Sequence, residues 1–133
     1  MRVDFNSLRP IYLQVADAIE DDILAGRLLE GEPVYSQLTL SRELGINPAT
    51  AAKGINQLVS KGILEKQRGL SMRIAYGAKD RLFSERRDTE IWELVENLCI
   101  AAVKIGLSKD TVIGKVSEYF DSTKKEKVGE QSE

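Results

Sequence analysis

The chain has 133 residues, of which 42% are hydrophobic and 30% are charged, a composition typical of a soluble globular protein. It contains no histidine and one cysteine, Cys99, which excludes an internal disulfide bond, a zinc finger and catalysis by a cysteine–histidine pair. No apolar run approaches the roughly 18 residues of a membrane helix, and the first residues lack the apolar core of a signal peptide. We therefore expect no membrane association and a cytoplasmic location.

The remaining polar residues give no sign of catalysis. Carboxylates are numerous, but no two of them are marked by their spacing as a general acid and a general base. We expect a protein that is not an enzyme and that holds no metal and no cofactor.

The charges are distributed unevenly along the chain. The overall net charge is −2, yet residues 1–35 carry seven acidic and three basic side chains, whereas residues 36–75 carry two acidic and six basic ones. A basic segment in an acidic chain indicates a localised surface for a polyanion. The alternative is an ordinary solvated face, which is what most charge clusters are.

A first helix is predicted after Pro10, because apolar residues recur there at helical spacing and Gly26 supplies a stop signal. The apolar residues of this helix, which we expect to pack beneath the next two helices, are Ile11, Val15, Ala18, Ile19 and Ile23.

Two capped helices with a tight turn between them are predicted next. Ser36 is a suitable N-cap for a short helix that ends at Gly45, a residue that favours the left-handed conformation. Asn47 and Pro48 then supply a second N-cap and a first helical residue, and this helix should run to about Lys61. A helix, a glycine-containing turn and a newly capped helix are typical of a helix-turn-helix motif.

The second helix of this motif has the composition of a DNA-recognition helix. Its expected buried stripe is Ala51, Ile55, Leu58 and Val59, and its expected exposed face is Thr50, Lys53, Gln57 and Ser60. Small side chains near its start allow close approach to the major groove, where the polar ones can reach base edges or phosphates. The alternative is an amphipathic helix whose polar face is merely solvated.

A β-hairpin is predicted directly after this helix. Residues 63–66 and 71–74 are strand-like, and Arg68 and Gly69 lie at the tip between them. A hairpin in this position is a wing, and Arg68 would point at the DNA backbone or into the minor groove. The candidate DNA-binding residues are therefore Ser36, Gln37, Asn47, Pro48, Ala49, Thr50, Lys53, Gln57, Arg68 and Gly69.

Over about residues 8–76 the chain resembles the N-terminal domain of GntR regulators. The segments that carry the resemblance are residues 10–15, 23–28, 40–50 and 62–69. The Asn-Pro-Ala-Thr start of the recognition helix and the short C-terminal part look most like the YtrA-like subfamily. The resemblance implies binding to double-stranded operator DNA as a homodimer, at a palindromic site and usually for repression.

Some positions depart from the family pattern. Leu38 stands where a DNA-contacting arginine is common, Pro48 and Ala52 stand where relatives are often basic, and Ser71 replaces a frequent glycine of the wing. Fewer cations imply fewer phosphate contacts and a shallower dependence of affinity on salt. They also leave open a second hypothesis, a winged-helix protein-interaction module that has lost DNA binding.

The C-terminal third is predicted to form two helices, one from Lys79 to about Ile105 and another after Ser108, with Gly106 between them. Two helices of this size are too small to enclose both a core and a ligand pocket. We expect their apolar stripes to pack against a second copy of the chain, the alternative being packing on the winged domain. The candidate dimerisation residues are Ile91, Leu94, Val95, Leu98, Ala102 and Ile105.

The predicted fold is thus mostly α-helical with a small β-hairpin wing (α+β). It comprises a winged helix-turn-helix domain at residues 1–76, a two-helix dimerisation segment at 77–122 and a flexible polar tail at 123–133. Cys99 is expected to be a buried thiol of the helical segment, the alternative being a reactive sensor thiol. A small-molecule effector at the dimer interface is left open, since no residue identifies one.

Overall fold

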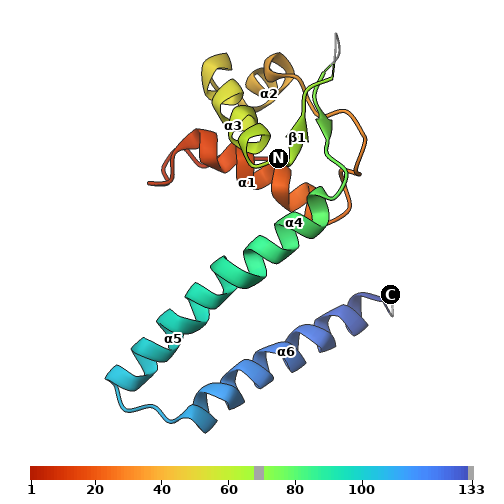
Figure 1. Cartoon of the computed structure of the whole chain (residues 1–133). Coiled ribbons are helices and arrows are strands. Elements are labelled where there is room, and N and C mark those ends of the chain that lie inside the picture. The colour runs from red at the N-terminus through yellow and green to blue at the C-terminus, as the bar shows by residue number, and fades with distance from the viewer. Residues whose placement is uncertain (68–70, 132–133) are drawn as a thin grey trace. The chain divides into compact units, whose positions relative to one another are not determined.

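The computed structural model describes residues 1–67 and 71–131, with side chains through residue 124, and it divides into two units (Figure 1). Met1–Arg87 form unit 1 and Asp88–Glu133 form unit 2. The described chain is mostly helical with one two-stranded antiparallel sheet, so the predicted fold class is confirmed. In this part of the chain no helix is long and apolar enough to cross a membrane.

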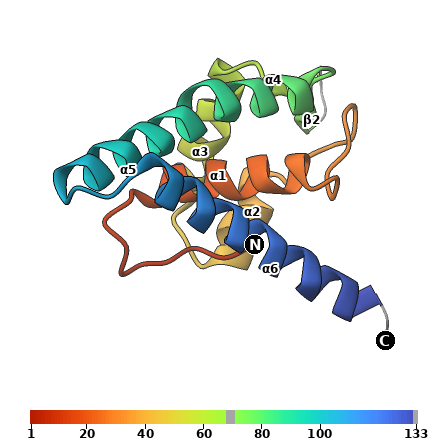
Figure 2. The same ribbon diagram turned by 90° about the horizontal axis from the view of Figure 1, so that it is seen from below.

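Unit 1 contains three helices, a small sheet and a fourth helix. The helices are α1 (Ile11–Leu24), α2 (Gln37–Leu44), α3 (Pro48–Ser60) and α4 (Ala78–Glu85), and the strands between α3 and α4 are β1 (Leu64–Glu65) and β2 (Arg73–Ile74). Helix α3 packs against both α1 and α2 (Figures 1 and 2). This order and packing are those of a winged helix-turn-helix domain.

Helix α1 supplies one wall of the core. Pro10 is its N-cap, and the carbonyl oxygen of Pro10 accepts hydrogen bonds from the amides of Leu13 and Gln14, each at 3.1 Å. The predicted stripe is largely confirmed, because Val15, Ile19 and Ile23 are buried. Ala18, in contrast, is only half-buried, and the neighbouring Ala16 takes its place in the core.

The sheet is shorter than predicted but has an additional neighbour. Leu64 pairs with Ile74 and Glu65 with Arg73, and Pro33 forms a bridge to Arg73 on the other side of β2. Three backbone hydrogen bonds of 2.7–2.9 Å tie residues 31–34 to this side of the hairpin. The segment before α2 therefore acts as an edge of the sheet and holds the base of the hairpin against the helices.

Helices α1 and α3 come into close contact at Gly54. A Cβ atom at this position would lie 2.8 Å from the carbonyl oxygen of Tyr12 and 3.1 Å from Cβ of Val15. Gly54 is buried, whereas Val59, which the sequence placed in the buried stripe of α3, is only half-buried. Gly54 therefore lies on the face of α3 that contacts α1. Only a residue without a side chain lets the backbone of α1 come this near.

Unit 1 extends beyond the boundary that the sequence indicated at residue 76. Ala78 and Leu82 of α4 are fully buried in the same core as α1. Arg86 follows α4 and bonds back to α1, with its guanidinium 2.8 Å from the carboxylate of Asp21 and 3.5 Å from that of Glu20. Because α4 completes the core, it belongs to unit 1, whereas the sequence analysis began the C-terminal segment at residue 77.

Unit 2 is a helical hairpin. A π-helical stretch, η1 (Arg86–Ile91), crosses the boundary between the units and leads into α5 (Trp92–Lys104), where the sequence predicted one regular helix. Gly106 has φ +74° and ends this run, as predicted. The next helix is α6 (Lys109–Gln131).

Helix α6 begins where the sequence predicted but extends further than predicted. Ser108 caps it as predicted, its hydroxyl oxygen accepting a hydrogen bond from the amide of Thr111 at 3.2 Å. Helix α6 continues to Gln131, so residues 123–131 are helical where the sequence predicted a flexible polar tail.

The contact at Gly54 can be tested by adding one methyl group. Gly54→Ala should lower the free energy of unfolding by about 1–3 kcal/mol, because the new Cβ atom meets the backbone of α1 and the helices must separate. The measurement is urea denaturation followed by circular dichroism.

The matched control is Gly114→Ala on α6, where nothing lies within 4 Å of the added Cβ atom. This change should leave the stability equal or raise it by up to about 1 kcal/mol, since alanine is the better helix former. Equal stability of Gly54→Ala and the wild type would contradict the close packing of α1 and α3.

Candidate nucleic-acid interface

The helix-turn-helix is built from capped helix ends, as the sequence predicted. The hydroxyl oxygen of Ser36 accepts a hydrogen bond from the amide of Thr39 at 3.1 Å and so begins α2. Gly45 ends α2 in the left-handed conformation, with φ +66°. The side-chain oxygen of Asn47 accepts from the amide of Ala49 at 2.8 Å and begins α3. The turn between the helices is therefore fixed by local hydrogen bonds and one glycine.

The N-terminal end and outer face of α3 are exposed and polar. Lys53, Gln57 and Ser60 are exposed, and Thr50 is half-buried. The structure thus brings six of the predicted DNA-binding residues onto one helix and its cap: Asn47, Pro48, Ala49, Thr50, Lys53 and Gln57.

Two further candidates lie at the start of the neighbouring helix. Ser36 caps α2 and Gln37 is its first residue, and both are exposed. The last two candidates, Arg68 and Gly69, lie outside the described residues. Arg42, at the end of α2, is also exposed. Its charge was counted in the basic segment, but it was not among the predicted site residues.

Not every cation of the basic segment faces solvent. Nζ of Lys61 lies 3.0 Å from the carboxylate of Glu20 and 3.0 Å from that of Glu85. The guanidinium of Arg73 lies 2.9 Å from the carboxylate of Glu65. These two cations hold elements of unit 1 together, so the positive charge left for a polyanion is smaller than the sequence suggested.

Lys61 is committed to this structural role by its electrostatics. Burial alone would lower the pKa of its ammonium group, but the hydrogen bonds to Glu20 and Glu85 outweigh that effect and raise the pKa above its usual value. Lys61 therefore stays charged and joins the end of α3 to α1 and α4.

Lys53 differs from Lys61 in its surroundings. Its ammonium nitrogen lies 4.1 Å from the centre of the Tyr12 ring, a cation–π distance, and in the described part of the chain it forms no salt bridge. This pairing could not be predicted from the sequence, because Tyr12 lies on α1 and only tertiary packing brings it to Lys53.

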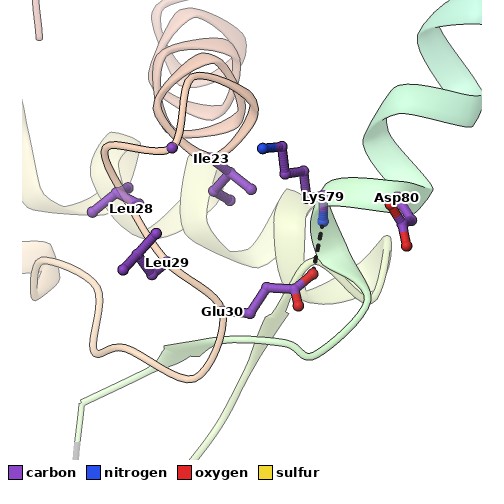
Figure 3. A pocket seen from close by; sticks show the side chains of 7 residues that line it. Ile23, Leu28, Leu29, Glu30, Lys79 and Asp80 are labelled. Carbon is purple, nitrogen blue, oxygen red and sulfur yellow. Dashed lines mark hydrogen bonds between the residues drawn. The ribbon is translucent and has the colours of Figure 1, made fainter.

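A shallow groove lies away from the exposed face of α3, at the end of α1 and the start of α4 (Figure 3). Its volume is about 290 Å³, and it is lined by Ile23, Gly26, Leu28, Leu29, Glu30, Lys79 and Asp80. The carboxylate of Glu30 accepts hydrogen bonds from the amides of Gly77 at 3.0 Å and Lys79 at 3.2 Å. Its oxygen is therefore engaged in beginning α4, a structural role. Among the described residues no cluster of acidic or cysteine side chains could hold a metal ion.

Unit 2 presents a broad apolar surface. Five of the predicted dimerisation residues are exposed, by 42–77%: Ile91, Leu94, Val95, Leu98 and Ile105. Ala102 is the exception, since only 7% of it is exposed within the single chain. Cys99, expected to be buried, is exposed as well, because two helices alone do not enclose an interior.

The helical hairpin of unit 2 also contains an apolar cleft near the turn between α5 and α6. The cleft has a volume of about 370 Å³ and is lined by Cys99, Ala102, Val103, Leu107, Lys109, Val112 and Ile113. This differs from the prediction that two helices of this size are too small to enclose both a core and a ligand pocket. The lining of the cleft comes from α5, from the turn after it and from the first turns of α6.

Comparisons with known proteins agree with this fold. The family model of the bacterial regulatory proteins of the gntR family matches residues 11–74. The HTH-type transcriptional repressor YtrA of Bacillus subtilis is 28% identical over 124 residues, which cover 93% of this chain and 95% of YtrA.

Two solved structures extend the comparison. YtrA from Sulfolobus acidocaldarius, a GntR-family transcription factor, is similar with a TM-score of 0.54 and 27% identity, covering 92% of this chain and 97% of that one. The DNA-binding domain of AraR in complex with operator ORX1 is similar with a TM-score of 0.52 and 26% identity, covering 56% of this chain and 95% of that one.

The fold and the exposed, capped helix define a winged helix-turn-helix protein of the class found in transcription regulators. The winged domain at residues 11–74 matches the gntR family of bacterial regulatory proteins, and the similarity to YtrA over nearly the whole length of both chains supports a regulator of the YtrA-like type. The relatives are regulators and not enzymes.

Proposed function

We propose that the chain is a sequence-specific DNA-binding repressor that acts in the cytoplasm as a homodimer on a palindromic operator. The observation that carries the proposal is the exposed polar face of α3, which begins at a capped N-terminus and follows a tight turn from α2. The similar domain of AraR was solved in complex with an operator, which supports the same use of this fold here.

Helix α3 is the element that enters the major groove in this proposal. Its first residues, Pro48 and Ala49, are small and exposed, so the helix can approach the base edges closely. Asn47, Thr50 and Gln57 supply hydrogen-bonding groups, and the positive end of the helix dipole favours a phosphate near the start of α3. Lys53 adds a cation on the same helix.

The apolar surface of unit 2 supports the homodimer. Exposed leucine and isoleucine side chains that recur along residues 91–105 are unusual on a monomer and mark an interaction site. A second copy offers the same surface, and a two-fold axis through it would present two recognition helices to two half-sites of inverted sequence. Ala102 takes no direct part in this surface, because it is already buried.

Repression follows from the simplest action of such a dimer, which is to occupy DNA that the transcription machinery needs. The Bacillus relative YtrA is itself named a repressor. An effector that releases the dimer would act at unit 2, where the cleft near the turn is comparable in volume to small-ligand pockets.

The DNA-binding role is tested by removing one cation from α3. Lys53→Ala should weaken binding to labelled DNA from the region upstream of the chain's own gene by about tenfold, because one charge-assisted contact is lost. Fluorescence anisotropy measures the dissociation constant.

The control is Lys79→Ala, which removes an exposed lysine from α4, outside α3. It should change the affinity by less than about twofold. Equal, small effects of both substitutions would favour the protein-interaction module over the DNA-binding regulator.

The dimer is tested by placing a charge on the apolar surface. Leu98→Glu should convert the dimer to a monomer, since a carboxylate buried at the interface has no partner there. Sedimentation velocity gives the mass. Leu8→Glu, at a fully exposed leucine of unit 1, should leave the dimer intact. A wild-type protein that is monomeric at micromolar concentration would exclude this mode of assembly.

A further inference from the structure

One aromatic side chain outside the helix-turn-helix contacts α3 at Lys53, one of the candidate DNA-binding residues. Tyr12 lies in the first turn of α1, and its ring centre is 4.1 Å from the ammonium nitrogen of Lys53 on α3. We propose that Tyr12 is a positioning residue for DNA binding, which holds the ammonium of Lys53 beside α1 so that it meets a DNA phosphate and not a base edge. This inference rests on the proposed function.

The packing of the two helices fixes the backbone that carries the ring. Gly54, the residue after Lys53, brings the backbone of α3 against the carbonyl oxygen of Tyr12, where a Cβ atom would lie at 2.8 Å. The ring of Tyr12 is half-buried and has only two rotatable bonds, so it is a rigid platform. Lysine has a flexible four-carbon stem, whose freedom such a platform restricts before DNA arrives.

An aromatic ring can position a cation without neutralising it. Lys61 is held by the carboxylates of Glu20 and Glu85, which cancel its charge toward any polyanion nearby. Lys53 is held by the electron-rich face of a neutral ring, so its full positive charge remains for a phosphate. The two lysines of the same helix region therefore divide into one structural and one DNA-binding cation.

The position of the ammonium decides what it can contact. Because it lies over a side chain of α1, it sits at the flank of α3 and not on the face that points furthest from the protein. A cation at the flank of a helix inserted in the major groove faces the sugar–phosphate backbone. Lys53 should then contribute to affinity for all sequences equally, and sequence discrimination should come from the other residues of α3.

The test compares two substitutions of the ring in two backgrounds. Tyr12→Leu removes the ring, and Tyr12→Phe keeps it; each is made in the wild type and in Lys53→Ala. Dissociation constants are measured by anisotropy on the upstream duplex and on a scrambled duplex, at two or more salt concentrations. Urea denaturation checks that every variant is folded.

We expect Tyr12→Leu to weaken binding to both duplexes by about 2- to 5-fold and Tyr12→Phe to bind like the wild type. In the Lys53→Ala background Tyr12→Leu should cause no further loss, since the ring then has no cation to hold. Lys53→Ala should reduce the salt slope by about 0.9 and leave the ratio of the two dissociation constants unchanged.

Several results would overturn the inference. An equal loss of affinity from Tyr12→Leu in the wild type and in the Lys53→Ala background would show that the ring acts through stability and not through Lys53. Tighter binding by Tyr12→Leu would mean that the ring withholds Lys53 from DNA, and equal losses for the leucine and phenylalanine variants would assign the effect to the hydroxyl group. A wild type that binds neither duplex would instead refute the proposed function.

A measurement without DNA tests the contact itself, and its result is informative whether or not the protein binds DNA. The ε-methylene protons of Lys53 should show an upfield ring-current shift by NMR in the wild type and in Tyr12→Phe, and this shift should disappear in Tyr12→Leu. The same chemical shift in all three proteins would overturn the contact.

Discussion

The close packing of α1 against α3 at Gly54 is the constraint on which the rest of unit 1 depends. It sets the distance between the two helices, and thereby the position of the apolar side chains of α1 beneath α3. The sheet and α4 then close the same core from the other side. A recognition helix must be held rigidly to present its polar face, and a glycine at the contact allows this without a side chain between the backbones.

The charged residues of unit 1 serve two separate purposes. Lys61 and Arg86 meet carboxylates of α1 and so join the ends of three helical segments around Glu20, which is itself buried. Lys53 meets an aromatic ring and keeps its charge exposed to solvent. Counting charges along the chain cannot make this distinction, because a cation's role depends on what the fold places next to it.

Features encoded by neighbouring residues were predictable from the sequence. The caps at Ser36 and Asn47 and the turn at Gly45 each depend on a few adjacent positions, and all three are confirmed. Features that depend on distant residues were not: the contact at Gly54, the pairing of Tyr12 with Lys53 and the inclusion of α4 in the first unit. The roles of the predicted DNA-binding and dimerisation residues stay predictions, since they concern partners outside the chain.

The central claim is that this chain binds a specific DNA sequence, and one titration tests it most directly. Purified protein is added to labelled DNA from the region upstream of its own gene and to a scrambled duplex of equal length, at two salt concentrations, and anisotropy is recorded. The account predicts that the upstream DNA binds more tightly by about 10³-fold or more and retains that preference at the higher salt. Equal, weak binding to both duplexes that vanishes with salt would contradict it.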